Sequence, residues 1–233
     1  MSDFVHYTKE LFEPLLLSKE ISDSFILKSN LDNLSSTNIL WKNTCFTDTN
    51  CNNSFFNNSQ FNNCKFFHSS LINSSFSNSN FTNSSYSGVS LIKLTLNNVN
   101  LYNHVFDSCT LQRANLSKVI IRNSVLKDFE GVLATLENCV FINSSFEINF
   151  GSGMNGFSSA AIKNCIFINC KFYGYPLRGA FLQNSTFSNC TGEISDDFSE
   201  ENTYGLSFPS VIKKLKLTDR NKAEKLINEV SNA

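Results

Sequence analysis

The sequence has little of what marks several common protein classes. Among its 233 residues, tryptophan occurs once, methionine twice and proline three times, and 19 Lys and Arg stand against 20 Asp and Glu, a formal net charge of −1. This balance gives no support to a globally basic nucleic-acid-binding protein. No run of about 18 apolar residues is present to form a membrane span, and the N-terminal segment carries acids where a secretion signal carries bases. We therefore expect a cytoplasmic protein with no membrane partner and no direct nucleic-acid partner.

Sequence motifs that carry chemistry are equally scarce. There is no Gly-rich phosphate loop, no zinc-protease motif and no carboxylate pair, and no catalytic or metal-binding set surrounds His6, His68 or His104 in the sequence. We expect no enzymatic activity, no cofactor and no metal site.

Asparagine, serine and phenylalanine dominate what is present. The chain has 33 Asn, 34 Ser and 23 Phe, and disordered chains of such polar content are poor in aromatic residues. Large apolar residues recur every five residues: from Trp41 to Phe146 they fill 20 of 22 such positions, the exceptions being Cys51 and Gly131. We call these the large positions.

Small residues form a second series, two residues before the large positions. From Thr44 to Ser144, 18 of 21 of these small positions hold Ser, Thr, Cys, Ala or Val, the exceptions being Leu94, His104 and Phe129. Asn recurs two residues after the large positions. A period of five matches neither a helix nor a flat strand. It fits a chain that turns a corner every five residues and sends one large and one small side chain inward on each side.

Four such sides close a coil of 20 residues, so residue n lies over residue n+20. Coils then stack at about 4.8 Å, the spacing of hydrogen-bonded strands. The large positions form a continuous core that no single repeat can bury alone, and Asn side chains one coil apart are placed to form amide ladders. His104, at a small position, is expected to be a core residue with a local hydrogen bond.

Stretches such as Ser74–Asn78 and Cys139–Asn143 resemble the pentapeptide-repeat family over about residues 39–192. The resemblance implies an all-β solenoid, a right-handed quadrilateral parallel β-helix. We count about seven coils with short helical caps at both ends. The expected domains are an N-terminal helical cap (1–23), the β-helix (24–192), and an acidic segment with a capping or dimerising helix (193–233).

Eight cysteines without a secretion signal indicate a reducing compartment and free thiols. Six of them fill small inward positions: Cys64, Cys109, Cys139, Cys165, Cys170 and Cys190. Cys170 and Cys190 are one coil apart and form the only plausible disulfide pair, and whether they pair stays open.

Two irregular stretches are the candidate partner-binding loops. Phe146 and the next large position, Phe157, are eleven residues apart, which indicates one residue added within a Gly-rich loop at 147–156. The stretch 173–179 keeps the phase but carries aromatic, Pro and Gly residues. The residues predicted to contact a partner are Phe150, Gly151, Met154, Tyr173, Tyr175 and Arg178.

The last residues predict a helix over 219–231. Its apolar stripe consists of Ala223, Leu226, Ile227 and Val230, and so short a helix needs a surface to pack on. That surface is the last coil or the same segment of a second molecule, and we favour a homodimer with Leu226, Ile227 and Val230 at its interface. A membrane-surface helix is a third possibility, but Glu224 and Glu229 interrupt its basic face.

Two functions are compatible with these features. The first is a non-enzymatic scaffold that binds a protein partner whose identity the sequence does not give. The alternative, implied by the resemblance, is a DNA-mimicking modulator of DNA gyrase or topoisomerase, like the quinolone-resistance members of the family. DNA carries one negative charge per about 1.7 Å of axis, whereas residues 39–192 hold ten Lys and Arg against six acids, a net +4 (10 − 6). We therefore favour the scaffold.

Overall fold

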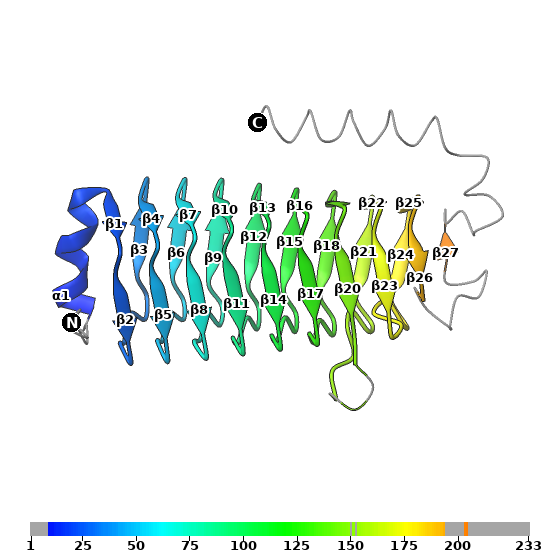
Figure 1. Cartoon of the computed structure of the whole chain (residues 1–233), viewed down its shortest axis with the longest axis horizontal. Helices are drawn as coiled ribbons and strands as arrows, with labels where there is room; N and C mark the ends of the chain where they lie inside the picture. The colour runs from blue at the N-terminus through cyan, green and yellow to red at the C-terminus, as the bar shows by residue number, and fades with distance from the viewer. Residues whose placement is uncertain (1–8, 150, 152, 194–202, 205–233) are drawn as a thin grey trace.

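Short parallel strands stacked into three sheets make up the molecule, which we describe from a computed structural model (Figure 1). The structure describes residues 9–149, 151, 153–193 and 203–204. Each coil contributes one strand to each sheet, and a turn closes the fourth side, where isolated bridges link Asn30, Asn50, Ser70, Ser90, Thr110, Glu130 and Gly156 in succession. The predicted quadrilateral parallel β-solenoid is confirmed.

Each sheet has nine strands. The first sheet contains β1 (Glu20–Ser22), β4 (Leu40–Lys42), β7 (Gln60–Asn62), β10 (Asn80–Thr82), β13 (Asn100–Tyr102), β16 (Ile120–Arg122), β19 (Val140–Ile142), β22 (Ile166–Ile168) and β25 (Thr186–Ser188). The second contains β2 (Phe25–Leu27), β5 (Cys45–Thr47), β8 (Lys65–Phe67), β11 (Ser85–Ser87), β14 (Val105–Asp107), β17 (Val125–Lys127), β20 (Ser145–Glu147), β23 (Lys171–Tyr173) and β26 (Thr191–Gly192). The third contains β3 (Ser35–Thr37), β6 (Phe55–Asn57), β9 (Ser75–Ser77), β12 (Thr95–Asn97), β15 (Asn115–Ser117), β18 (Thr135–Glu137), β21 (Ala161–Lys163), β24 (Phe181–Gln183) and β27 (Thr203–Tyr204).

The register is n to n+20 along most of the rod, as the period predicts. Phe61 pairs with Phe81 across β7 and β10, and their rings stack with centroids 4.4 Å apart. Trp41 stacks on Phe61 at 5.8 Å, and the first sheet repeats this stacking near its far end. Phe167 there lies 4.7 Å from Phe141 and 4.6 Å from Phe187. These stacked rings, with the aliphatic residues that occupy the same columns, form the core.

The number of coils is nine, so the predicted count of about seven is wrong. An additional coil precedes Trp41, in which Ile21, Ile26 and Leu31 are buried. Ser36 occupies the next large position of that coil and is also buried. At the other end β26 and β27 pair with β23 and β24 and, with β25, complete a ninth coil, in which Phe187 is the large inward residue.

The N-terminal cap ends before Glu20, earlier than the predicted boundary at residue 23. It consists of one α-helical turn, α1 (Lys9–Phe12), and the 3-10 helix η1 (Glu13–Ser18). The buried residue of this cap is Phe12, whose ring stacks on Trp41 at 5.9 Å, whereas Leu15 is 39% exposed. The first strand begins at Glu20. The predicted C-terminal helix lies outside the described residues.

His104 is completely buried, as predicted, but the predicted local hydrogen bond of its side chain is absent among the described residues. Both of its ring nitrogens have no hydrogen-bond partner among the described residues, and aromatic rings surround it, those of Phe81, Tyr86 and Phe106. Desolvation by burial lowers the pKa of His104 from 6.5 to about 3.

The small positions are filled as expected. Of the six cysteines there, five are buried and Cys190 is half-buried, and all eight cysteines are free thiols. Cys170 and Cys190 are neighbours without a bridge, and their hydrogen bond, followed by burial, raises the pKa of Cys170. The sequence analysis missed a second pair. Burial and then a hydrogen bond with Cys139 raise the pKa of Cys165, so these two thiols also lie together.

No helix in the part of the chain that the structure describes is long and apolar enough to cross a bilayer.

Candidate partner-binding groove

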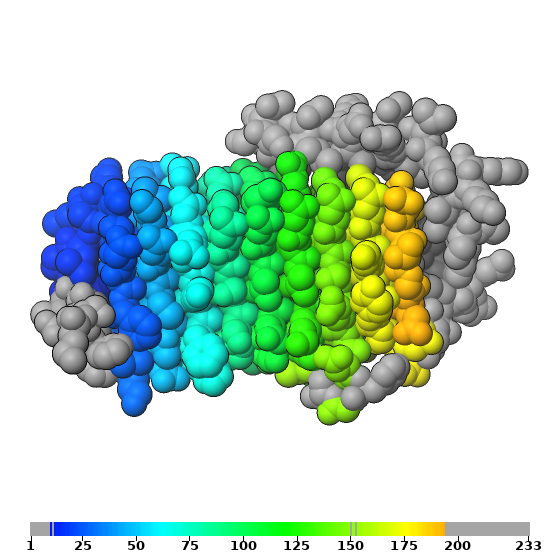
Figure 2. All heavy atoms as spheres, in the orientation of Figure 1, coloured from blue at the N-terminus to red at the C-terminus, as the bar shows by residue number. Residues whose placement is uncertain are grey.

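The coil departs from its regular path between β20 and Gly156. Phe146 pairs with Phe172, 26 residues later, where regular coils have 20, so six residues are inserted (26 − 20). The predicted insertion of one residue is wrong, because six residues shift a five-residue period by the same phase as one. The inserted loop stands out from the side of the rod (Figures 1 and 2).

Asp128 fixes the start of this loop. Its carboxylate accepts hydrogen bonds from the backbone N–H of Asn149 at 2.8 Å and from the Asn149 amide Nδ2 at 2.6 Å. Ile148, just before, donates its N–H to the carbonyl of Tyr173 at 2.9 Å. The loop therefore leaves the rod from a point held by the coils on both sides.

The turn at 173–179, one coil further on, holds the loop from the other side. Gly174 has φ +70°, and a Cβ there would meet the carbonyl oxygen of Ile148. Gly156 has φ +57°, and a Cβ there would meet the carbonyl of Pro176. Phe157 donates its N–H to that same Pro176 carbonyl at 2.8 Å. Backbone contacts that only glycine permits thus hold the inserted loop against the 173–179 turn.

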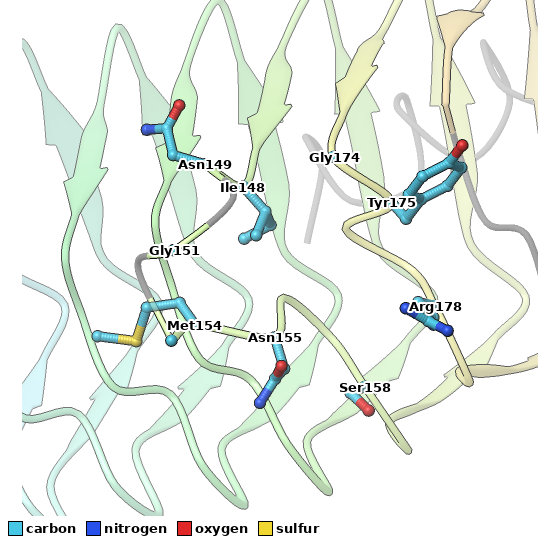
Figure 3. A pocket seen from close by; sticks show the side chains of 10 residues that line it. Ile148, Asn149, Gly151, Met154, Asn155, Ser158, Gly174, Tyr175 and Arg178 are labelled. Atoms are coloured by element: carbon cyan, nitrogen blue, oxygen red, sulfur yellow. The ribbon is translucent and has the colours of Figure 1, made fainter.

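A groove of about 390 Å³ lies between them. Figure 3 shows Met154 and Asn155 of the loop on one side and Tyr175 and Arg178 of the turn on the other. The remaining lining residues are Ile148, Asn149, Gly151, Gly153, Ser158 and Gly174. At the edge of this turn, the N–H of Gly174 donates to the Glu193 carboxylate at 3.2 Å.

Four of the predicted contact residues meet in this groove: Gly151, Met154, Tyr175 and Arg178. Tyr173 is separate. It lies on the outward face of β23, is 51% exposed, and lines an adjoining hollow with Glu147 and Lys171. Phe150 and the predicted interface residues Leu226, Ile227 and Val230 lie outside the described residues.

The sequence analysis missed Ile148, Asn149, Asn155 and Ser158, and it missed the anchor Asp128. The signal for Asp128 was present, because stacking places it one coil below Ile148.

The groove offers several kinds of side chain for binding. Its lining combines a guanidinium, a phenol, a thioether, amides and backbone groups. Within the described ranges, no three His, Cys, Asp or Glu side chains come together as a metal site would need.

Comparison with known proteins supports the fold more than the function. Pentapeptide repeats match residues 44–83 and 87–128 in eight copies. No curated protein matches the sequence. The full-length structure of QnrB1, a plasmid-mediated fluoroquinolone resistance protein, is 13% identical with a TM-score of 0.42, and the alignment covers 85% of this chain and 98% of that one.

Two further solved structures are similar at the same level. HetL from the cyanobacterium Nostoc, a pentapeptide repeat protein involved in heterocyst differentiation regulation, is 13% identical with a TM-score of 0.36, covering 82% of this chain and 92% of that one. An alginate lyase from Paenibacillus is 8% identical with a TM-score of 0.39, covering 84% and 95%. These low TM-scores carry no argument about function. Over residues 44–128 the chain is similar to the pentapeptide-repeat proteins, and the same five-residue pattern continues through the described coils on both sides.

Proposed function

We propose that this protein is a non-enzymatic scaffold that binds a protein partner through the groove between the 148–156 loop and the 173–179 turn. The observation that carries the proposal is the rigid joining of the two irregular stretches. Six inserted residues leave the coil, and glycine contacts from the next coil hold them against Tyr175 and Arg178.

The groove has the side chains that concentrate binding energy at protein interfaces. Tyr, Met and Arg are enriched there relative to the rest of a protein surface. The contact surface also extends beyond the groove, because the half-exposed ring of Tyr173 lies beside it on the second sheet. A rigid rod presents such a surface without the entropic loss of ordering it on binding.

The DNA-mimic alternative is not favoured by the charge of the rod. Coils that replace duplex DNA need a strongly acidic surface, whereas residues 39–192 carry the net +4 counted above. A gyrase supercoiling assay tests this directly. The alternative would be the better explanation if stoichiometric amounts of the protein inhibited or protected gyrase and the groove variant described next did not.

The test of the scaffold is affinity capture with matched variants. Tyr175→Ala/Arg178→Glu removes the aromatic and cationic groups of the groove. Phe55→Ala/Arg113→Glu is the control, because it changes an exposed aromatic and an exposed cation elsewhere on the rod. We expect one partner to be retained by the wild type and the control and to bind the groove variant roughly tenfold or more weakly, as for loss of a hot-spot residue. Equal capture by both variants would refute the groove as the binding surface.

A further inference from the structure

Three neighbouring strands of the first sheet bury a residue that points out of the rod. In β16, β19 and β22 the inward residues are Ile121, Phe141 and Phe167, yet the preceding residues are buried too. Those outward residues, Ile120, Val140 and Ile166, are 1%, 0% and 3% exposed. Ile142 and Ile168 pack against them, and we call these five residues the outer patch.

This burial is specific to the outer patch. In every other three-residue strand described, the middle residue alone is buried. Aliphatic outward residues elsewhere remain accessible: Val105 is 38% exposed, and Leu40, in the same sheet, is half-buried. An outward residue on this rod is therefore not buried merely because it is aliphatic. The burial of the outer patch requires another segment that covers it.

The cover is not one of the described elements. The described strands pack along their own sheets, and α1 and η1 pack at the first coil, so within the described ranges no helix or strand lies over the outer patch. We infer that the C-terminal segment 219–231 of the same chain docks along the outer patch.

The lengths agree with this assignment. Thirteen helical residues extend about 20 Å at 1.5 Å each, and three adjacent strands span about 10 Å. The last described residue, Tyr204, lies in the ninth coil beside Gln183. The 14 residues from 205 to 218 reach at most about 49 Å, and Val140 is only two coils back, about 10 Å along the rod.

The N-terminal residues do not reach. Residues 1–8 precede α1 at the first coil and extend at most about 28 Å, whereas Ile166, in the eighth coil, is about 34 Å away along the rod.

The chemistry of the segment is also complementary. Its stripe of Ala223, Leu226, Ile227 and Val230 matches an aliphatic surface. The Nε of Arg122, at the edge of the patch in β16, is buried without a hydrogen-bond partner among the described residues. Glu224 and Glu229 flank the stripe and bring carboxylate acceptors to this face.

Photo-crosslinking of the full chain tests the docking. With benzoylphenylalanine in place of Leu226, we expect adducts on peptides that contain Ile120, Val140 or Ile166. The control carries the same group in place of Asn228, on the opposite side of the predicted helix, and gives none of these adducts. A mixture of isotope-labelled and unlabelled protein separates docking within one chain from exchange between two.

Each other outcome overturns the inference. Adducts between labelled and unlabelled chains would show a dimer, adducts on residues 172–192 would show a cap on the last coils, and adducts on a co-purifying protein or no adducts would show that another occupant covers the patch.

A second measurement, of thermal stability, does not depend on the crosslinking probe. Val140→Asp should lower the melting temperature of the full chain by several degrees but have little further effect once residues 219–233 are removed, whereas Val105→Asp should act equally in both backgrounds. If Val140→Asp and the truncation lower the melting temperature by additive amounts, the docking is contradicted.

Discussion

At the scale of single residues, the asparagines of this chain serve the corners of the coil. The residue after most strands has a left-handed backbone: φ is 49° at Asn43, 54° at Asn63 and 50° at Asn103. Asn tolerates this conformation better than other non-glycine residues. Its amide also bonds to the next coil, for example from Asn63 Nδ2 to Asn43 Oδ1 at 2.9 Å, which confirms the predicted ladders. The Asn content therefore follows from backbone geometry as well as from exposure.

The backbone explanation predicts different effects for the same substitution at two exposed positions. Asn78 has φ +50° and accepts a hydrogen bond from Asn98 Nδ2, whereas Asn97 is in the extended strand β12. A β-branched side chain is strained in the left-handed region by about 1–2 kcal/mol. We expect Asn78→Val to lower the free energy of unfolding by that amount and Asn97→Val to leave it nearly unchanged, as measured by urea denaturation. Equal losses would show that the left-handed corner does not select Asn.

The buried His104 predicts a dependence of stability on pH. Its folded pKa of about 3 lies below the unfolded value of 6.5, so the unfolded chain binds the proton first. Above pH 6.5 His104 is neutral in both the folded and the unfolded state, so its titration does not lower the free energy of unfolding. That free energy falls progressively as the pH drops from 6.5 towards 3, by about 2 kcal/mol at pH 5 at 1.36 kcal/mol per pH unit.

A comparison of the wild type with His104→Leu at pH 7.5 and pH 5 isolates this effect, because the other titrating groups cancel in the difference. We expect the wild type to lose about 2 kcal/mol relative to the variant on going to pH 5. A difference that does not change with pH would mean that His104 is protonated in the folded protein.

At the scale of the elements, the decisive contact is between the loop and the turn. Gly174 and Gly153 both have positive φ, +70° and +72°, so alanine strains the backbone similarly at each. Only at Gly174 does the added Cβ meet another group, the carbonyl of Ile148, while at Gly153 nothing lies within 4 Å. We expect Gly174→Ala to lower the melting temperature clearly more than Gly153→Ala and to weaken partner binding. Equal shifts would mean that the contact between the two stretches contributes nothing.

The regular elements could be predicted from the sequence, and the irregular ones only in part. Stacking makes each column visible as a repeat, which gave the fold, the buried Phe residues and the two candidate stretches. The size of the loop was not visible, because phase is known only to within a multiple of five. The exceptions Phe129 and Gly131 were visible in the sequence, but not how they fit together. The ring of Phe157 packs against Phe129 and fills the space that a side chain at Gly131 would occupy.

At the scale of the whole molecule, the rod is a nearly one-dimensional array in which each coil contacts its neighbours. The first and last coils therefore pack against a neighbouring coil on one side only. Their stability depends on what covers the other side. At the N-terminal end, the ring of Phe12 lies 5.9 Å from that of Trp41 with an angle of 13° between the planes. Trp41 is the only tryptophan in the chain, so its fluorescence reports on this end alone.

Removal of this ring should uncouple the first coils from the rest. Phe12→Ala deletes a buried aromatic side chain, which costs about 3–5 kcal/mol in a closed core. In a linear array that loss acts on the adjacent coils first. We expect the Trp41 fluorescence of the variant to change at a lower urea concentration than the far-ultraviolet circular dichroism, which averages over all coils, whereas the two transitions coincide in the wild type. Phe181→Ala, which removes a 59% exposed ring from β24 near the opposite end, is the control and should leave both transitions in place. If the two probes still coincide in Phe12→Ala, the nine coils unfold as one cooperative unit and the cap stabilises the rod as a whole.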